Sequence, residues 1–253
     1  PLDDLVGLEK GDRALAVTSL SAKGPSLALG TRNGIVKRVN PELLSKDSWE
    51  VISLKDGDEV VGAVEMGDED LELCFVTQGA ALLHFPASTV RPQGRLGGGV
   101  AGIKAKDPVI FFGAAPSHGS SVVTVAASSP SAAGKAPGSI KLTPFDQYPS
   151  KGRATGGMRC QRFLRAETAL VLAWIGPDPA VACAASGVPI ELPAPNMRRD
   201  GSGDQGRQPI LAVGSRRHGS GKDDWASDGS VSDSDDPLSN DGEQTGTQPD
   251  LFS

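Results

Sequence analysis

Apolar and polar positions alternate with a period of two over short segments of this chain, as in Leu71–Val76 and Ser139–Leu142. No window keeps apolar residues at helical spacing for three turns, and 32 glycines and 19 prolines interrupt the pattern throughout. Short apolar segments bounded by turn residues are typical of β-strands. The pattern therefore predicts an all-β fold without long helices.

The strand segments also recur along the chain. Similar units open at Gly11, Gly57, Asp107 and Glu167, which lie 46, 50 and 60 residues apart. A period near 50 residues with about four strands per unit is typical of propeller-like blades. We expect a β-pinwheel domain over residues 1–214, with four blades of about four strands at about 5–56, 57–106, 107–166 and 167–214.

Two of these units contain a hairpin signal. Asn33-Gly34 and Gln78-Gly79 each separate two apolar strands. Asn-Gly is a strong two-residue hairpin signal because both positions tolerate positive φ. We expect Gly34 and Gly79 to have structural roles in these turns.

Charge divides the chain into two parts. The formal net charge is −6, and the segment from Ser215 onward carries three cations and nine acids, whereas residues 1–214 hold 22 of each. This segment is rich in Ser, Asp and Gly and almost free of aliphatic residues, so it cannot bury enough apolar surface to offset its ordering entropy. We expect 215–253 to be a disordered acidic tail. Eight further acids between Asp56 and Glu72 predict an exposed acidic edge.

Other features limit the class of protein. The three cysteines, Cys74, Cys160 and Cys183, are far apart and form no Cys-x-x-Cys pair, which favours a reducing compartment. The longest apolar run, Ala169–Ile175, is far shorter than the roughly 20 residues that cross a bilayer. The start at Pro1, without Met or a secretory leader, suggests a fragment of a longer protein.

Two patterns of nucleotide-binding type are weak. Gly97–Gly102 fits G-x-G-x-x-G, but Pro108 follows too closely for the helix that this motif requires. Gly219–Lys222 is similar to part of a phosphate-binding loop, yet it lies in the acidic tail. No nucleophile and base are paired in the sequence, so we expect no complete catalytic site and no cofactor or metal in this chain.

Cations gather on glycine-rich connections late in the units. Glycine allows backbone N–H groups to approach a phosphate, and Lys and Arg supply charge. Aromatic residues are only 4% of the chain, which argues against base stacking of single strands. The alternative is that exposed glycine-rich loops carry cations without any function. The candidate DNA-binding residues are Arg32, Lys37, Arg38, Arg91, Arg95, Lys104, Lys106, Lys151, Arg153, Arg159, Arg162, Arg165, Arg198 and Arg199.

Four segments carry a family resemblance: ALGTRNGIVKRV, FVTQGAALLHFPASTVRPQGRLGGGVAGIKAKD, KLTPFDQYPSKGRATGGMRCQRFL and ELPAPNMRRDGSG. They resemble the C-terminal β-pinwheel of bacterial type IIA topoisomerase A subunits, and the resemblance spans about residues 5–214. It implies blades whose positive rim binds and bends the transported DNA duplex. The catalytic residues of that family lie outside this chain, and the single tyrosine, Tyr148, is expected to pack or to make a surface contact.

The resemblance also implies partners and surroundings. It implies double-stranded DNA, a topoisomerase B subunit that hydrolyses ATP, and an A2B2 assembly that needs ATP and Mg²⁺. It further implies a cytoplasmic, nucleoid-associated enzyme that acts in chromosome segregation.

One seven-residue motif, which we call the box, bears on which type IIA topoisomerase the chain resembles. Gyrase carries Q-R-R-G-G-K-G, whereas the nearest segment here is Gln93–Gly99, QGRLGGG, in which glycine replaces the second residue and the lysine. This departure favours a topoisomerase IV-like domain that relaxes and decatenates over a gyrase-type wrapping domain for negative supercoiling. A protein-binding propeller without a DNA role and a truncated, non-functional copy remain as alternatives.

Overall fold

The alternating segments form strands in the computed structural model, which describes residues 7–8, 11–21, 24–67 and 70–216. The chain divides into two units, residues 1–217 and 218–253, and the description below concerns the first. The described residues contain strands and the 3-10 turns η1 (Ala87–Thr89), η2 (Pro130–Ala132) and η3 (Phe145–Gln147), but no α-helix. The all-β prediction is therefore confirmed. The predicted disorder of the acidic tail falls outside the described residues from position 217 onward.

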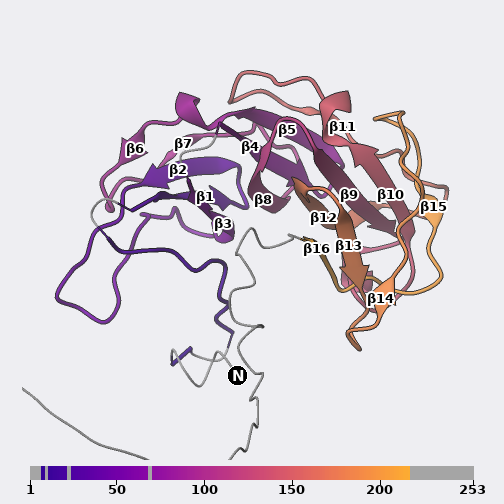
Figure 1. Ribbon diagram of the computed structural model, residues 1–253, viewed down its shortest axis with the longest axis horizontal. Coiled ribbons are helices and arrows are strands. Elements are labelled where there is room, and N and C mark those ends of the chain that lie inside the picture. Colours follow the sequence, from indigo (N-terminus) through magenta and orange to yellow (C-terminus); the bar gives the residue numbers. More distant parts are fainter. Residues whose placement is uncertain (1–6, 9–10, 22–23, 68–69, 217–253) are drawn as a thin grey trace, which may run out of the picture. The chain divides into compact units, whose positions relative to one another are not determined.

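Each of the four sheets has the same inner-to-outer order of strands (Figure 1). The first sheet contains β3 (Val60–Met66), β1 (Ser26–Thr31), β2 (Ile35–Val39), β6 (Pro92–Gln93) and β7 (Val100–Ala101), the last also pairing with β2. The second contains β8 (Val109–Pro116), β4 (Leu71–Thr77), β5 (Ala81–Pro86) and β11 (Met158–Arg159). The third contains β12 (Ala169–Pro177), β9 (Ser120–Ala127), β10 (Ser139–Pro144) and β15 (Asp204–Gln205). The fourth contains β16 (Ala212–Ser215), β13 (Ala180–Cys183) and β14 (Pro189–Ile190).

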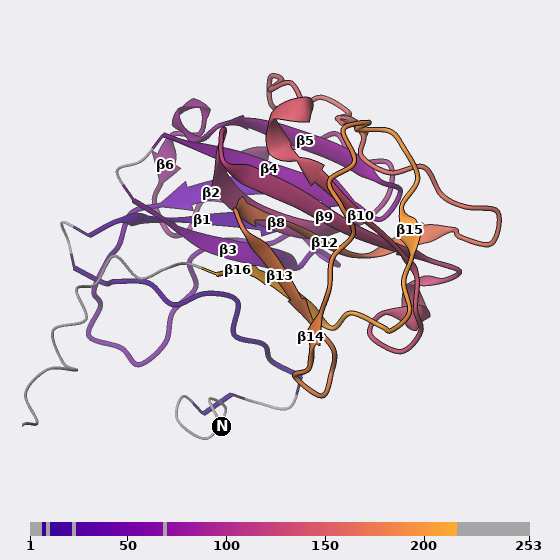
Figure 2. The ribbon, with the colours of Figure 1, turned by 45° about the vertical axis from the view of Figure 1, so that its right-hand side comes forward.

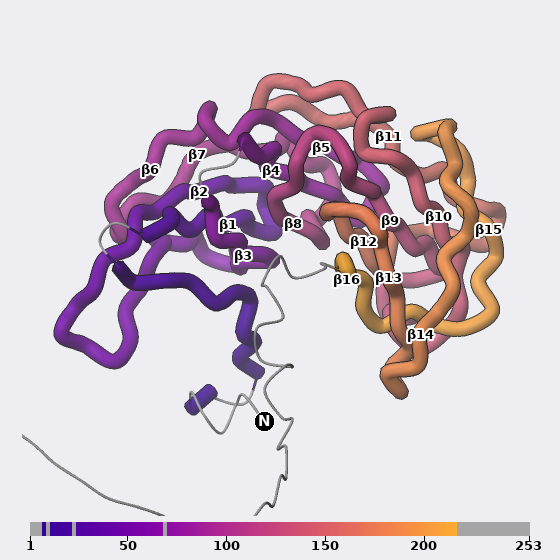
Figure 3. The backbone as a smooth tube through the Cα atoms, viewed as in Figure 1, coloured from indigo at the N-terminus to yellow at the C-terminus, as the bar shows by residue number. Residues whose placement is uncertain are grey.

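The outer strands come from later in the chain than the strands they pair with. The second strand of each hairpin, β2, β5 or β10, pairs with β7, β11 or β15, which arrive after the chain has built part of the next sheet. Figure 3 follows this path along the outer side of the sheets, from β6 and β7 past β11 to β15. Each of the first three sheets thus combines strands from two of the ranges 5–56, 57–106, 107–166 and 167–214, whereas the fourth sheet is built from the last part of the chain alone.

The hairpins between the central strands share a threonine. In the first two sheets, Thr31 Oγ1 accepts a hydrogen bond from the N–H of Ile35, and Thr77 Oγ1 accepts one from Ala81, both at 3.1 Å. Gly34 has a φ of 85°, as the hairpin signal predicted. In the second hairpin the positive φ, 63°, falls on Ala80 and not on Gly79. A Cβ on Gly79 would lie 2.2 Å from Asp107 Oδ2, the end of a side chain that would have to turn aside.

The core lies where adjacent sheets meet. Phe112 of β8 contacts Phe75 of β4, with ring centroids 4.9 Å apart, and its side chain lies over β1 of the first sheet. A Cβ on Gly30 would lie 2.1 Å from Phe112 Cγ, so glycine at this position allows the second sheet to approach the first. Figure 2 shows the inner strands β3, β8 and β12 next to one another. Dense apolar packing of this kind supplies most of the stability of an all-β domain.

Candidate nucleic-acid interface

Three tight turns on the outer side of the sheets each carry an arginine at their second position. They are Gly94–Gly97, 152–155 and Arg198–Gly201, and their arginines are Arg95, Arg153 and Arg199. The N–H of Gly97 donates to the oxygen of Gly94, and that of Gly201 to Arg198, both at 3.0 Å. In the middle turn Thr155 Oγ1 donates to Gly152 at the same distance.

Strand register shows that the three turns are equivalent. Each arginine lies six residues before the residue that pairs with the start of β2, β5 or β10. The register pairs are Ala101 with Ile35, Arg159 with Ala81, and Gln205 with Ser139. The first, second and third sheets therefore present one arginine each at the same place. We refer to this set of three turns as the arginine rim.

Main-chain hydrogen bonds join the turns to neighbouring segments. The N–H of Lys104 donates to the oxygen of Thr155 at 2.9 Å, and that of Ala154 donates to Gly102 at 2.5 Å. Farther along, the N–H of Arg162 donates to Gly201 at 2.9 Å. The turn of the second sheet thus contacts the segment after β7, and the turn of the third contacts the segment after β11. Each of these two turns is therefore bonded to the segment that follows the outer strand of the preceding sheet.

A groove between two of these segments gathers cations. Its volume is about 370 Å³, and Lys104, Lys106 and Arg159 line it together with the main chain of Gly156 and Gly157. Asp107 also lines it. Cationic side chains beside glycine main chain suit a phosphate, because small residues allow close approach and the cations supply charge.

The other predicted residues lie mostly at the surface. Arg95 is half-buried and its Nε lies 4.0 Å from Glu42, whereas Arg32 forms an exposed ion pair with Glu59 at 2.9 Å. Arg198 pairs with Asp200 at 3.1 Å, and its hydrogen bond lowers the pKa of that carboxyl group. The exposed candidates are Arg32, Arg91, Lys104, Lys106, Lys151, Arg153, Arg159, Arg162, Arg165, Arg198 and Arg199.

Two of the predicted residues are not available to a phosphate. Lys37 is fully buried, and its Nζ donates to the main-chain oxygens of Val51, Arg95 and Gly97, each at 2.7 Å. Arg38 is half-buried and donates to the oxygen of Ala87 and to Ser26 Oγ, both at 3.1 Å. Both residues belong to β2 and not to an outer connection. Internal oxygens bind Lys37 Nζ and the two terminal guanidinium nitrogens of Arg38, whereas Arg38 Nε has no partner, so the structure gives no support to the DNA-binding prediction for these two residues.

Sequence reasoning also missed a buried cation. Lys141 of β10 is almost fully buried, and its Nζ donates to Thr143 Oγ1 at 2.6 Å, to Arg199 O at 2.8 Å and to Cys160 O at 3.0 Å. Burial lowers the pKa of Lys141 to about 8. A lysine between two aliphatic residues of an alternating strand, Ile140 and Leu142, was the available signal.

Not all of the acids between Asp56 and Glu72, which were predicted to form an exposed edge, are exposed. Glu72 is half-buried, and its Oε2 lies 2.9 Å from Nδ1 of the buried His84. The other ring nitrogen, Nε2, lies 2.8 Å from the oxygen of Tyr148. Tyr148 itself is buried in the core of the second and third sheets, as expected for a packing role. Glu72 and His84 therefore connect β4 and β5 to the chain that leads into the middle turn.

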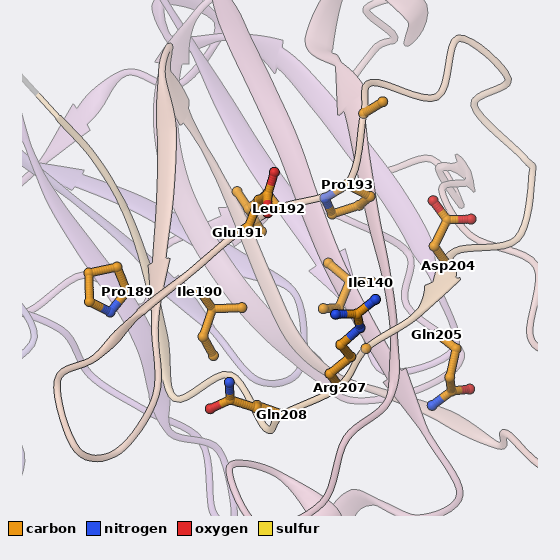
Figure 4. Close-up of a pocket in the computed structure, with 12 residues that line it drawn as sticks. Ile140, Pro189, Ile190, Glu191, Leu192, Pro193, Asp204, Gln205, Arg207 and Gln208 are labelled. Atoms are coloured by element: carbon orange, nitrogen blue, oxygen red, sulfur yellow. The ribbon is translucent and has the colours of Figure 1, made fainter.

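A second groove, of about 470 Å³, lies beside β14 and β15 (Figure 4). Arg207 and Gln208 line it with Ile140, Glu191 and a run of prolines and aliphatic residues. This mixed lining lacks the gathered cations of the first groove. Among the residues that the structure describes, no group of three or more His, Cys, Asp or Glu could hold a metal ion. In the same part of the chain no helix is long and apolar enough to cross a membrane.

Comparison with known sequences agrees with the fold. A model of the DNA gyrase C-terminal domain, a β-propeller, matches residues 71–115 and 138–164. The DNA gyrase A protein of Chlamydia trachomatis serovar D is 29% identical over 112 residues, which cover 42% of this chain and 13% of the relative. The corresponding gyrase A protein of Staphylococcus aureus strain MRSA252 is 26% identical over 197 residues, which cover 76% of this chain and 21% of the relative. The chain thus spans a small part of the length of these relatives.

Solved structures share the architecture. The C-terminal domain of DNA topoisomerase IV superposes with a TM-score of 0.67 at 18% identity, covering 84% of this chain and 68% of that structure. The DNA gyrase A C-terminal domain gives 0.58 at 15% identity, with 84% and 73% covered. The C-terminal domain of E. coli ParC gives 0.55 at 13% identity, with 75% and 80% covered.

Sheets that exchange their outer strands and carry equivalent basic turns define a β-pinwheel, the predicted fold class. The chain shares this fold with the C-terminal domains of topoisomerase IV and DNA gyrase A, and in part of its length it is similar in sequence to the C-terminal domain of DNA gyrase A.

Proposed function

We propose that this domain holds a transported DNA duplex for a topoisomerase IV-like enzyme, through the arginine rim. The observation that carries the proposal is the equivalent placement of Arg95, Arg153 and Arg199 on three successive sheets. Cations repeated on successive sheets suit a DNA duplex whose phosphates are contacted at several places along its length. Such contact positions and bends DNA without reading bases.

The groove lined by Lys104, Lys106 and Arg159 lies beside Gly156 and Gly157, which directly follow the middle turn. Lys151, Arg162, Arg165 and Arg198 are exposed on the segments that contain or adjoin the turns. We propose that these residues add phosphate contacts. Arg91 and Arg32 are also exposed, and we assign them weaker contributions because Arg32 is paired with Glu59.

Gyrase-type wrapping is the second candidate, since the curated relatives are gyrase A proteins. The box segment Gln93–Gly99 supports the topoisomerase IV assignment instead, because glycines replace two of its charged positions. Within this segment Gln93 Oε1 accepts the N–H of Gly99 at 3.0 Å, so glutamine closes the loop. In either enzyme we propose that a B subunit supplies ATP hydrolysis, that Mg²⁺ acts in another domain, and that the complete enzyme contains two copies of each polypeptide.

Ligation of nicked plasmid in the presence of the full chain tests the proposal. Salt-sensitive duplex binding without a shift in linking number is the expected result for a topoisomerase IV-like domain. A protein-dependent shift would mean chiral wrapping and would favour the gyrase-type domain. Absence of duplex binding at low salt would overturn both and favour a protein-binding propeller.

A further inference from the structure

Two buried lysines occupy equivalent positions beneath two of the three turns. In β2, Val36 pairs with Val100, and in β10, Ile140 pairs with Asp204. Lys37 and Lys141 each follow the paired residue, and both side chains are almost fully buried. The same position in β5 of the second sheet is Leu83, which follows Leu82, the partner of Met158.

Both lysines bind the main-chain oxygen of the arginine in their turn. Lys37 Nζ donates to Arg95 O at 2.7 Å, and Lys141 Nζ donates to Arg199 O at 2.8 Å. Lys37 Nζ also donates to the oxygens of Val51 and Gly97. Lys141 Nζ also donates to Thr143 Oγ1 and Cys160 O, and its longest contact, at 3.3 Å, is with the Tyr148 hydroxyl. The repetition of one contact in two sheets with different surroundings indicates a common role.

The lysine holds the turn in one conformation, and the turn in return supplies oxygens to the buried ammonium group. An ammonium group has three donors and no acceptor, and its burial is costly unless oxygens surround it. Neither lysine forms an ion pair shorter than 4.0 Å with an acid of the described residues, so neutral oxygens bind both. The turn supplies two of the three oxygens that Lys37 Nζ binds and one of the four that Lys141 Nζ binds, so each lysine loses a hydrogen bond when its turn moves away. Glycine-rich turns are otherwise free to adopt many conformations.

The second turn is held differently and provides an internal comparison. Arg153 itself donates to the oxygen of Ala101 at 3.2 Å, and the N–H of Ala154 donates to Gly102. Leu83 contributes apolar packing to the core of the first two sheets. A change at residue 83 therefore probes the same strand position without touching a turn anchor.

We propose that Lys37 and Lys141 are positioning residues of the arginine rim. They hold the main chain of Arg95 and Arg199 so that these side chains meet DNA phosphates, and they do not themselves touch DNA. Ordering the turn before DNA arrives reduces the entropic cost of binding. This inference rests on the proposed DNA-binding function.

Duplex binding by the full chain, measured by fluorescence anisotropy over a salt series, tests the positioning role. Arg199→Ala should reduce the slope of log K against log salt by about 0.9, the value for one phosphate contact. Lys141→Met should reduce the slope by a similar amount, and adding it to Arg199→Ala should change nothing further. Leu83→Met is the matched control and should leave the slope unchanged. Fully additive effects of Lys141→Met and Arg199→Ala would overturn the inference.

A measurement without DNA separates the inference from the proposed function. Trypsin cleavage after Arg199 of the folded chain should accelerate about tenfold in Lys141→Met, the equivalent of one lost hydrogen bond to a charged group. Leu83→Met should be cleaved at the native rate. An unchanged cleavage rate in Lys141→Met would overturn the inference whatever the chain does with DNA. Faster cleavage in a chain that binds no duplex would support the anchoring of the turn and overturn its role in DNA binding.

Lys141→Gln replaces Lys141→Met in both measurements if the methionine variant fails to fold. Glutamine keeps N–H donors but loses the charge and the reach of lysine, so cleavage after Arg199 should again accelerate. The circular dichroism spectrum and the urea midpoint of each variant show whether the sheets are intact. A folded Lys141→Gln variant with native cleavage and native salt slope would overturn the inference.

Discussion

Glu72 and His84 face one another across β4 and β5, with Oε2 and Nδ1 2.9 Å apart and only 13% and 5% of their side-chain surfaces exposed. Both ring nitrogens of His84 face oxygens, since Nε2 lies 2.8 Å from Tyr148 O. Ser150 Oγ donates to the same Glu72 oxygen at 2.8 Å. One carboxylate therefore holds both the histidine and the chain that enters the middle turn of the arginine rim.

Glu72→Gln should destabilise the domain by about 1–3 kcal/mol, because it removes the charged acceptor of two hydrogen bonds in a poorly solvated place. Urea unfolding at neutral pH measures this loss. Glu59→Gln is the matched control, since Glu59 is exposed and pairs with Arg32, and its cost should stay below about 1 kcal/mol. Equal costs for the two changes would contradict the structural role of Glu72.

Arg153→Ala together with Lys151→Ala should weaken binding to duplexes of all sequences alike. Each lost phosphate contact should lower the salt slope by about 0.9. Lys135→Ala, which removes an exposed cation outside the three turns, should leave the slope unchanged. A slope that responds to residue 135 and not to residues 151 and 153 would remove the middle turn from the DNA path.

Gly30→Ala should cost about 2 kcal/mol or more, because the added Cβ would lie 2.1 Å from Phe112 Cγ and would push the second sheet from the first. Gly214→Ala is the control within another strand, where a Cβ would meet no atom within 4 Å. Thermal unfolding of the two variants provides the comparison. A Gly30→Ala variant as stable as Gly214→Ala would show that the two sheets do not pack through Phe112.

The stability contribution of Lys141 should rise with pH above about 8. Burial lowers its pKa to about 8, against the weaker opposing effects of Cys160 and Asp200. The unfolded chain then binds more protons at residue 141 than the folded chain between pH 8 and its ordinary pKa of 10.5. The free energy of unfolding therefore gains at most about 1.4 kcal/mol per pH unit in that window.

The difference in unfolding free energy between the native chain and Lys141→Met isolates this effect. Measured by urea unfolding from pH 7 to 10, it should grow in favour of the native chain as pH rises. Lys135→Met, which removes an exposed lysine, is the matched control. A flat difference for residue 141 would mean that its ammonium is not buried as described.

One cysteine should react with a thiol reagent in the folded chain. Burial raises the pKa of Cys160 to about 12 and raises that of Cys74 well above its ordinary value, and neither side chain is exposed. Cys183 is only half-buried. A colorimetric thiol assay should therefore titrate one group before unfolding and all three after it. Rapid reaction of two or more thiols in the native state would contradict the burial of Cys74 and Cys160.

Sequence patterns determined the class of secondary structure and the repeat. Alternation in segments such as Leu71–Val76 predicted strands because a strand with one buried face needs apolar residues at every second position. The Asn33-Gly34 hairpin followed from local turn chemistry, since the positive φ of Gly34 needs no distant partner. The family resemblance added the β-pinwheel and the basic rim, neither of which follows from strand periodicity.

Tertiary structure alone decided which lysines and arginines are available. Lys37 and Lys106 are both cations beside glycine turns in the sequence, yet one is fully buried and the other is exposed. The difference arises because β2 receives its outer strand from residues 100–101, which carry the chain across Lys37. A side chain is covered by segments that arrive tens of residues later, and local patterns hold no record of that pairing. The same long-range pairing aligns Arg95, Arg153 and Arg199, which no fixed spacing in the sequence relates.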